Sequence, residues 1–251
     1  MIEFLLLLLT GLLAGLMIGS VGIGGVILVP ILSYVGGIGL HNAIAAAMFA
    51  FLISGATGTL LYAKNRSIDA GMAAWLFVGA MPAAFAGALA ASVLPTTLLE
   101  LCLGLLAAIT GLHSLKEQGD QSQDAVRKPL LPGALVAIGV VTGILSALTG
   151  TGGPLVLIPI LMWCRVPVLT AIGLSQAIQL PIGTLATAGN LTTGSLDLTT
   201  GVMLGIGISL GTIGGGKLAH RLPRMILKRI VCLLLILVGL SILFKLGYAQ
   251  I

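Results

Sequence analysis

Ser20-Val21-Gly22-Ile23-Gly24-Gly25 interrupts one apolar run, and Thr149-Gly150-Thr151-Gly152-Gly153-Pro154 interrupts another. Each glycine-rich break is followed by an apolar segment with a proline near its middle, Pro30 in the first and Pro159 in the second. Lipid cannot satisfy the N–H and C=O groups of non-helical backbone, so such backbone occurs at membrane depth only where protein or a cavity surrounds it. Matching interrupted segments in two halves of a membrane protein therefore predict a binding site between them.

The composition places the chain in a membrane. Of its 251 residues, 58% are hydrophobic and only 8% are charged, and the mean hydropathy is +1.18; a soluble domain has about 25% charged residues. We therefore expect an all-α polytopic protein of the cell (inner) membrane, surrounded by lipid. The net charge of +5 comes from basic residues in short loops, which indicate topology rather than a nucleic-acid partner.

Apolar segments divide the chain into ten predicted membrane segments. They lie at about 2–19, 25–40, 42–63, 70–91, 96–115, 131–148, 154–168, 169–189, 196–217 and 222–246. Most have the roughly 20 residues that a hydrocarbon core of about 30 Å requires. The two segments directly after the breaks are shorter, so they are either tilted spans or re-entrant half-helices.

The two halves of the chain repeat each other. Pro30 aligns with Pro159 at an offset of 129, and after a one-residue slip an offset of 128 aligns Asp69 with Asp197. The same register matches further glycines and prolines: Gly55 with Gly183, Gly79 with Gly207, Gly87 with Gly215, and Pro95 with Pro223. Such a match over a whole half indicates an internal duplication. We expect a first membrane repeat at 1–116, a cytoplasmic linker at 117–130 and a second repeat at 131–251, together forming one domain.

Charge distribution predicts that the two copies are inverted. The 64–68 loop carries Lys64 and Arg66, whereas its equivalent near 190–197 carries no basic residue; in the next pair of loops the second copy, at 217–229, is the basic one. By the positive-inside rule, equivalent loops then lie on opposite sides of the membrane. An inverted repeat needs an odd number of crossings, and five segments per copy fits. This topology places both termini outside.

Recognition of a substrate would fall to backbone, hydroxyl and amide groups. No Asp, Glu, Lys or Arg lies in the middle of a predicted span, whereas ionisable groups at depth are usual in proton pumps and metal transporters. Each break opens a helix N-terminus, which favours anions, and Ser20 or Thr151 could cap such a start while Pro154 suits a first turn. Inversion would direct both N-termini toward the bilayer midplane. The alternative is that the glycines serve only close helix packing.

The candidate substrate-binding residues are the two breaks and a polar face between 169 and 189. They comprise Ser20, Gly22, Gly24, Gly25, Thr149, Gly150, Thr151, Gly152, Gly153, Ser175, Gln176 and Gln179. Ser175 and Gln179 share a helix face at i, i+4. Membrane helices also hide such groups in helix–helix hydrogen bonds, so both roles stay open for the glutamines. The three cysteines form no CxxC pair, and no His cluster accompanies them, so neither a metal nor a cofactor is predicted.

At this point the chain resembles the sulfite exporter TauE/SafE family of membrane permeases. The resemblance rests on the duplicated glycine-rich break ahead of a proline, on the Ala-rich helix that follows, and on the Ile68-Asp69 and Leu196-Asp197 turns. Where a fuller glycine motif would continue, the first break has Val21 and Ile23 and the second has Pro154. The family implies transport, often export, of sulfite, sulfonates or related small anions.

These observations favour a small-anion permease that works by alternating access and is not an enzyme. The scheme is also consistent with a homo-oligomer. A non-transporting membrane scaffold or assembly subunit is the alternative; it would show no flux and would carry a co-purifying partner.

Overall fold

The computed structural model describes residues 2–21, 24–64, 66–116, 130–164, 166–219, 233, 236–237 and 239–247. All regular elements in these residues are helices, which confirms the expected all-α polytopic fold. Four helices are long and apolar enough to cross a membrane: α3 (Leu40–Lys64), α4 (Ala70–Val93), α6 (Pro132–Thr149) and the part of α9 (Leu198–Ala219) up to Gly215. The other long helices are α1 (Ile2–Val21), α5 (Thr96–Lys116) and α8 (Val168–Thr192). Most of the predicted linker and of the 222–246 segment lies outside the described residues.

The helices that follow the two breaks are short. The first is α2 (Gly25–Pro30), which continues as the π-helix η1 (Ile31–Val35), and the second is α7 (Pro154–Trp163). At 1.5 Å per residue each apolar helix is roughly 15–17 Å long, about half of the hydrocarbon core. Of the two alternatives that the sequence left open, the structure therefore shows half-helices.

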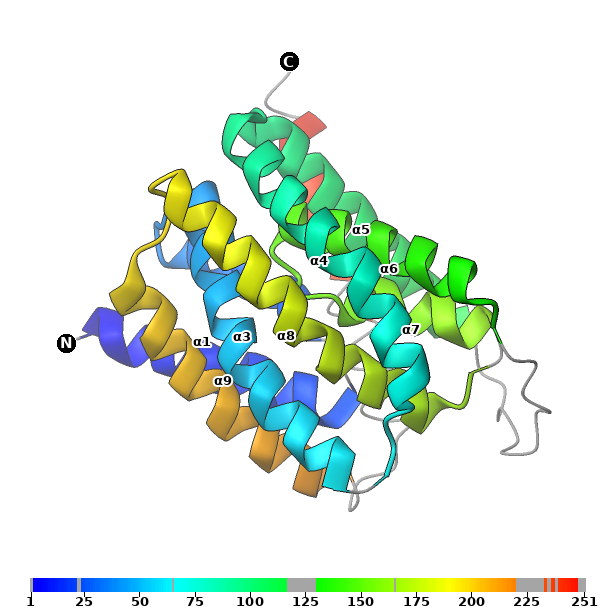
Figure 1. Ribbon diagram of the computed structural model, residues 1–251. Coiled ribbons are helices and arrows are strands. Elements are labelled where there is room, and N and C mark those ends of the chain that lie inside the picture. Colours follow the sequence, from blue (N-terminus) through cyan, green and yellow to red (C-terminus); the bar gives the residue numbers. More distant parts are fainter. Residues whose placement is uncertain are drawn as a thin grey trace.

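Helices from opposite halves of the chain pack most closely. Along α1 and α9, which lie side by side in Figure 1, glycines of one helix abut the backbone of the other, with Gly207 at Leu8, Gly211 at Leu12 and Gly215 at Leu16. These contacts advance together along both chains, so α1 and α9 are parallel. Contacts of Gly79 with Val136 and of Gly87 with Ile144 make α4 and α6 parallel in the same way. These glycines, which lie outside the two breaks, let the helices pack closely.

At the centre, α3 crosses α8 with the opposite direction. Gly183 meets Leu52, whereas Gly58 meets Gln176, so residue numbers fall along one helix as they rise along the other. Gly201 and Gly205 of α9 pack on Phe49 and Ile53, which makes α9 parallel to α3. The molecule therefore contains two groups of parallel helices, α1, α3 and α9 against α4, α6 and α8.

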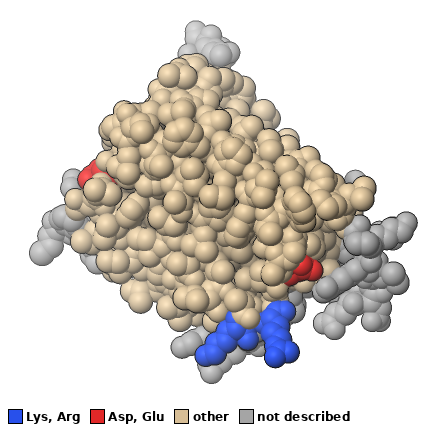
Figure 2. Space-filling view, viewed as in Figure 1, with Lys and Arg blue, Asp and Glu red and all other residues tan. Residues whose placement is uncertain are grey.

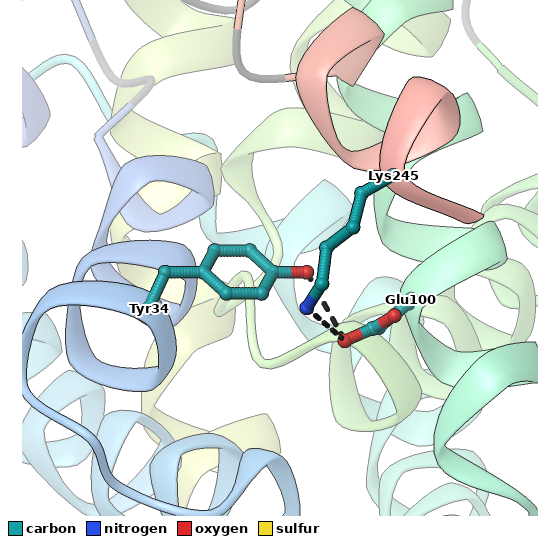
Figure 3. Close-up of polar contacts among 3 residues, drawn as sticks. All are labelled: Tyr34, Glu100 and Lys245. Carbon is teal, nitrogen blue, oxygen red and sulfur yellow. Dashed lines mark hydrogen bonds and ion pairs between the residues drawn. The ribbon is translucent and has the colours of Figure 1, made fainter. Parts of the chain in front are cut away.

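Among the described residues, charged side chains lie near the ends of the helices. The broad face in Figure 2 is almost entirely uncharged, with Lys and Arg at one edge and two small acidic patches near the margins, as expected for a surface that lipid covers. At the opposite end, where α3 begins, Tyr34 donates a 3.1 Å hydrogen bond to Glu100, and Lys245 Nζ lies 3.8 Å from the same carboxylate and 4.2 Å from the tyrosine ring centre (Figure 3). Glu100 thus offsets the charge of Lys245, a basic residue that the predicted topology places outside.

The aligned aspartates begin equivalent helices. Asp69 is the N-cap of α4 and accepts a 3.1 Å hydrogen bond from the backbone N–H of Met72. Asp197 accepts from the backbone N–H groups of Thr199 and Thr200 at the start of α9. The 2.6 Å hydrogen bond from the Thr200 hydroxyl lowers the pKa of Asp197, which lies in an exposed turn. A lowered pKa stabilises the fold at neutral pH, and this contribution is lost on acidification.

We expect Asp69→Ala and Asp197→Ala each to lower the free energy of unfolding by about 1 kcal/mol, because each removes a helix N-cap. Thermal unfolding in detergent measures this loss. Asp→Asn is the matched control, since asparagine caps as well as aspartate does. If Asn and Ala destabilised the protein equally, the charge and not the cap would be responsible.

Candidate functional site

The second break is a tight turn built on three glycines with positive φ. Gly150, at φ 69°, ends α6, and both its N–H and that of Thr151 bond to the carbonyl oxygen of Ser146. Gly152 and Gly153 follow at φ 76° and 112°, and Pro154 opens α7. Only glycine adopts such a run without strain. The break therefore stops one helix and starts the next within a few residues.

The first break brings α2 back against the end of α1. A side chain at Gly24 would collide with the carbonyl oxygen of Ala14 and would lie 2.8 Å from the Ile18 side chain. Gly24 is the N-cap of α2, and no side chain caps that helix. The described part of this break thus places another uncapped helix start inside the protein.

The two breaks meet. A Cβ atom at Gly25 would lie directly against the carbonyl oxygen of Thr151, so the two backbones are in contact. Both breaks lie beside the middle of the long central helices, because Gly25 faces Phe51 of α3 and Gly153 faces Ile178 of α8. Since α3 and α8 begin at opposite ends of the bundle, α2 and α7 lead away from this point in opposite directions.

One aromatic ring fills the space between the breaks. A Cβ at Gly25 would be 2.8 Å from Cζ of Phe51, and one at Gly152 would be 2.7 Å from its Cδ2. The side chain is 1% exposed and is the largest that is fully buried among the described residues. Phe51 therefore packs against the backbone of both breaks.

A chain of buried amides joins α3, α8 and α1. The Ser54 hydroxyl donates to Gln179 Oε1 at 3.1 Å, Gln179 Nε2 donates to Gln176 Oε1 at 3.2 Å, and Gln176 Nε2 donates to the carbonyl oxygen of Ile18 at 3.3 Å. These three side chains are fully buried. The Ile18 carbonyl belongs to the last turn of α1, which has no helical partner for its oxygens, so Gln176 satisfies a group that the first break leaves open.

Two buried hydroxyl groups near the second break could each form a hydrogen bond with a ligand. Thr142 and Ser146 of α6 are 0% exposed, and their hydroxyls have no hydrogen-bond partner among the described residues. The Thr142 methyl would lie 3.8 Å from a Cβ at Gly153. Buried hydroxyls are normally hydrogen-bonded, so these two hydroxyls beside a helix N-terminus are suited to bind a polar ligand.

The structure brings most of the predicted site residues into this region. The remaining glycines of the breaks, Gly24, Gly25, Gly150, Gly152 and Gly153, are buried there with Thr149 and Thr151, whose hydroxyls lie 3.0 Å apart. Gln176 and Gln179 contact each other at i, i+3. Ser175 instead donates to the Ile172 carbonyl within its own helix. Gly22 lies outside the described residues.

The expected capping by Ser20 or Thr151 is wrong. The N-caps of α2 and α7 are Gly24 and Gly153, and neither helix has a side-chain cap. Ser20 is still inside α1 and donates to the carbonyl oxygen of Leu16 at 2.6 Å, as a helical serine commonly does. Thr151 lies two residues too early and faces Thr149. Both half-helices consequently start with open backbone N–H groups.

Sequence reasoning missed Phe51, Thr142 and Ser146. A phenylalanine in an apolar helix carries no pattern that distinguishes it from other core residues. One indication was available in the repeat register, because an offset of 128 aligns Phe51 with Gln179, which was predicted as a site residue.

The half-helices, the buried uncapped helix starts and the uncharged lipid face are features of a multi-pass membrane transporter. No group of three His, Cys, Asp or Glu side chains that could hold a metal occurs in the described part of the chain.

Comparison with known proteins identifies the family. The family model of the sulfite exporter TauE/SafE matches residues 7–242, so the chain belongs to this family and is a membrane transporter. A probable membrane transporter protein of Bacillus subtilis (strain 168) is 25% identical over 96% of this chain and 100% of its own length. Another, from Methanocaldococcus jannaschii, is 30% identical over 70% of this chain and 69% of its own. No solved structure matches the chain at a significant level.

Proposed function

We propose that this protein exports small anions such as sulfite or organosulfonates, which bind near the membrane midplane between the starts of α2 and α7. The contact of Gly25 with the Thr151 backbone carries this proposal, because it joins two uncapped helix N-termini at mid-height of the bundle. A helix N-terminus attracts negative charge through its open N–H groups and its dipole. The unpartnered hydroxyls of Thr142 and Ser146 add two further donors.

We infer that the site lies on the axis of an inverted repeat. The equivalent helices α3 and α8 run antiparallel, and the parallel pair α1 and α9 has its counterpart in α6 and α4. Such an arrangement supports alternating access, in which one group of helices moves against the other around a fixed site. Residues 149–158 are all buried, which corresponds to a closed state of the proposed site.

The membrane potential supports the outward direction. With the inside negative, outward movement of a monoanion is favoured by about 2.3 kcal/mol per 100 mV. That energy corresponds to a concentration ratio of roughly 50-fold at equilibrium for a uniporter. No embedded carboxylate is needed for this driving force.

Reconstitution in liposomes tests the function. Vesicles that contain the protein and labelled sulfite or sulfoacetate should lose the label faster when a potassium gradient with valinomycin makes the interior negative. Protein-free vesicles with the same contents should not. Folded protein that moves none of these anions at any potential would contradict the proposal. A stoichiometric co-purifying protein together with absent flux would instead favour a scaffold.

A further inference from the structure

The side chain of Phe51 is held by the two breaks themselves. Its ring approaches Gly25 at the start of α2 and Gly152 ahead of α7, and a Cβ at either position would fall within 3 Å of ring carbons. Both contacts are with glycine backbone, so the ring presses on the two segments that form the proposed anion site. A ring in this position and a ligand at both helix starts would compete for the same space.

The pseudo-equivalent position carries a polar residue. The repeat register aligns Phe51 of α3 with Gln179 of α8, and Gln179 is hydrogen-bonded to Ser54 and Gln176. The two walls of the site therefore differ, with an amide network along α8 and an aromatic ring on α3. Fixed hydrogen bonds hold Gln179 in place, whereas contacts alone hold Phe51. Of the two, the ring is the side chain that can rotate away without breaking a hydrogen bond.

We propose that Phe51 is the gate of the anion site and sets the size of the substrate that it accepts. This inference rests on the proposed function. In the closed state the ring covers the N-termini of α2 and α7, and substrate entry requires the ring to leave. The face of an aromatic ring carries partial negative charge and its edge partial positive charge, so a bound anion would contact the ring edge and not its face.

A first test measures access to the site without transport. In a variant lacking the three native cysteines, Thr151→Cys gives a reporter at a residue that is 2% exposed. An anionic methanethiosulfonate reagent, which carries a sulfonate, should label this cysteine at least tenfold faster when Phe51→Ala is added. Phe49→Ala is the matched control, because Phe49 lies on the same helix and packs on Gly201 of α9 instead of on the breaks.

A second test measures selectivity in liposomes. Phe51→Ala should raise the ratio of benzenesulfonate flux to sulfite flux at least tenfold, and Phe49→Ala should leave the ratio at the wild-type value. Phe51→Leu keeps most of the side-chain volume and covers the case in which alanine prevents folding; it should shift the ratio in the same direction by a smaller factor.

Equal labelling rates and equal flux ratios in the wild type, the Phe51 variants and Phe49→Ala would overturn the gate and leave the anion transporter intact. A wild-type protein without any anion flux would instead remove the proposed function, and the gate with it. If Phe51 only filled the core, the Phe51 and Phe49 variants would lose stability and flux in parallel without a change in selectivity.

Discussion

Replacing Gly25 with alanine is expected to reduce anion flux to below about one tenth of the wild-type rate. The added methyl group would collide with the carbonyl oxygen of Thr151 and would lie 2.8 Å from the Phe51 ring. Backbone cannot rotate away as a flexible side chain can, so the two breaks must separate. Overpacking of this kind costs about 1–3 kcal/mol, and roughly 1.4 kcal/mol is already a tenfold change in an equilibrium. We expect the loss to appear in transport because these two segments form the proposed anion site.

Flux of labelled sulfite in liposomes, normalised to the amount of folded protein, measures this loss. Gly39→Ala is the matched control: a Cβ at Gly39 meets nothing within 4 Å, and the residue lies in the loop between η1 and α3. It should transport like the wild type. Normal flux in Gly25→Ala would show that the breaks need not be in contact and that the glycines serve another purpose.

Replacing Gln176 with leucine is expected to destabilise the protein by about 2 kcal/mol. The substitution keeps the size of the side chain but leaves the Ile18 carbonyl and one Gln179 donor without partners. An unsatisfied buried group costs about 1–3 kcal/mol, although hydrogen bonds between membrane helices average only about 0.6 kcal/mol. Flux should fall with stability, because the end of α1 is no longer tied to α8.

Thermal unfolding and sulfite affinity, measured on the same preparations, separate the two roles that the sequence left open for this glutamine. Ser175→Ala is the control, since Ser175 is equally buried but bonds only within its own helix; its loss should be small. If Gln176→Leu weakened sulfite binding at unchanged stability, the amide would be a substrate ligand and not a link between helices.

The two breaks, the shortness of the segments that follow them and the aspartate turns could be predicted because each depends on local chemistry. Glycine, proline and N-cap residues restrict the backbone wherever they occur, and the repeat doubles the information at each position. The capping role of Ser20 was wrong because its hydroxyl had an equally good acceptor one turn earlier in α1. Because α1 extends to Val21, Ser20 is still inside the helix and bonds to the Leu16 carbonyl instead of to the N–H groups at the start of α2.

The contacts between helices could not be predicted from local sequence patterns. The helices are apolar on all sides, so no stripe indicates which neighbour each one takes, and the sequence therefore does not show that α1 packs on α9 or that Phe51 reaches both breaks. The neighbours of Thr142 and Ser146 were hidden for the same reason. Polar residues of an apolar helix are visible in a sequence, but their partners become clear only from the packing.

The pairing of α1 with α9 has a consequence for biosynthesis. The backbone of α1 packs against the glycines of a helix that begins only at Leu198, so α1 is synthesised long before its partner. Until α9 is inserted, lipid chains or insertion chaperones must cover the surface of α1 that later packs against the backbone of α9. Chains that terminate before Leu198 should therefore be recognised as incomplete and degraded, even though most of their helices have already been inserted.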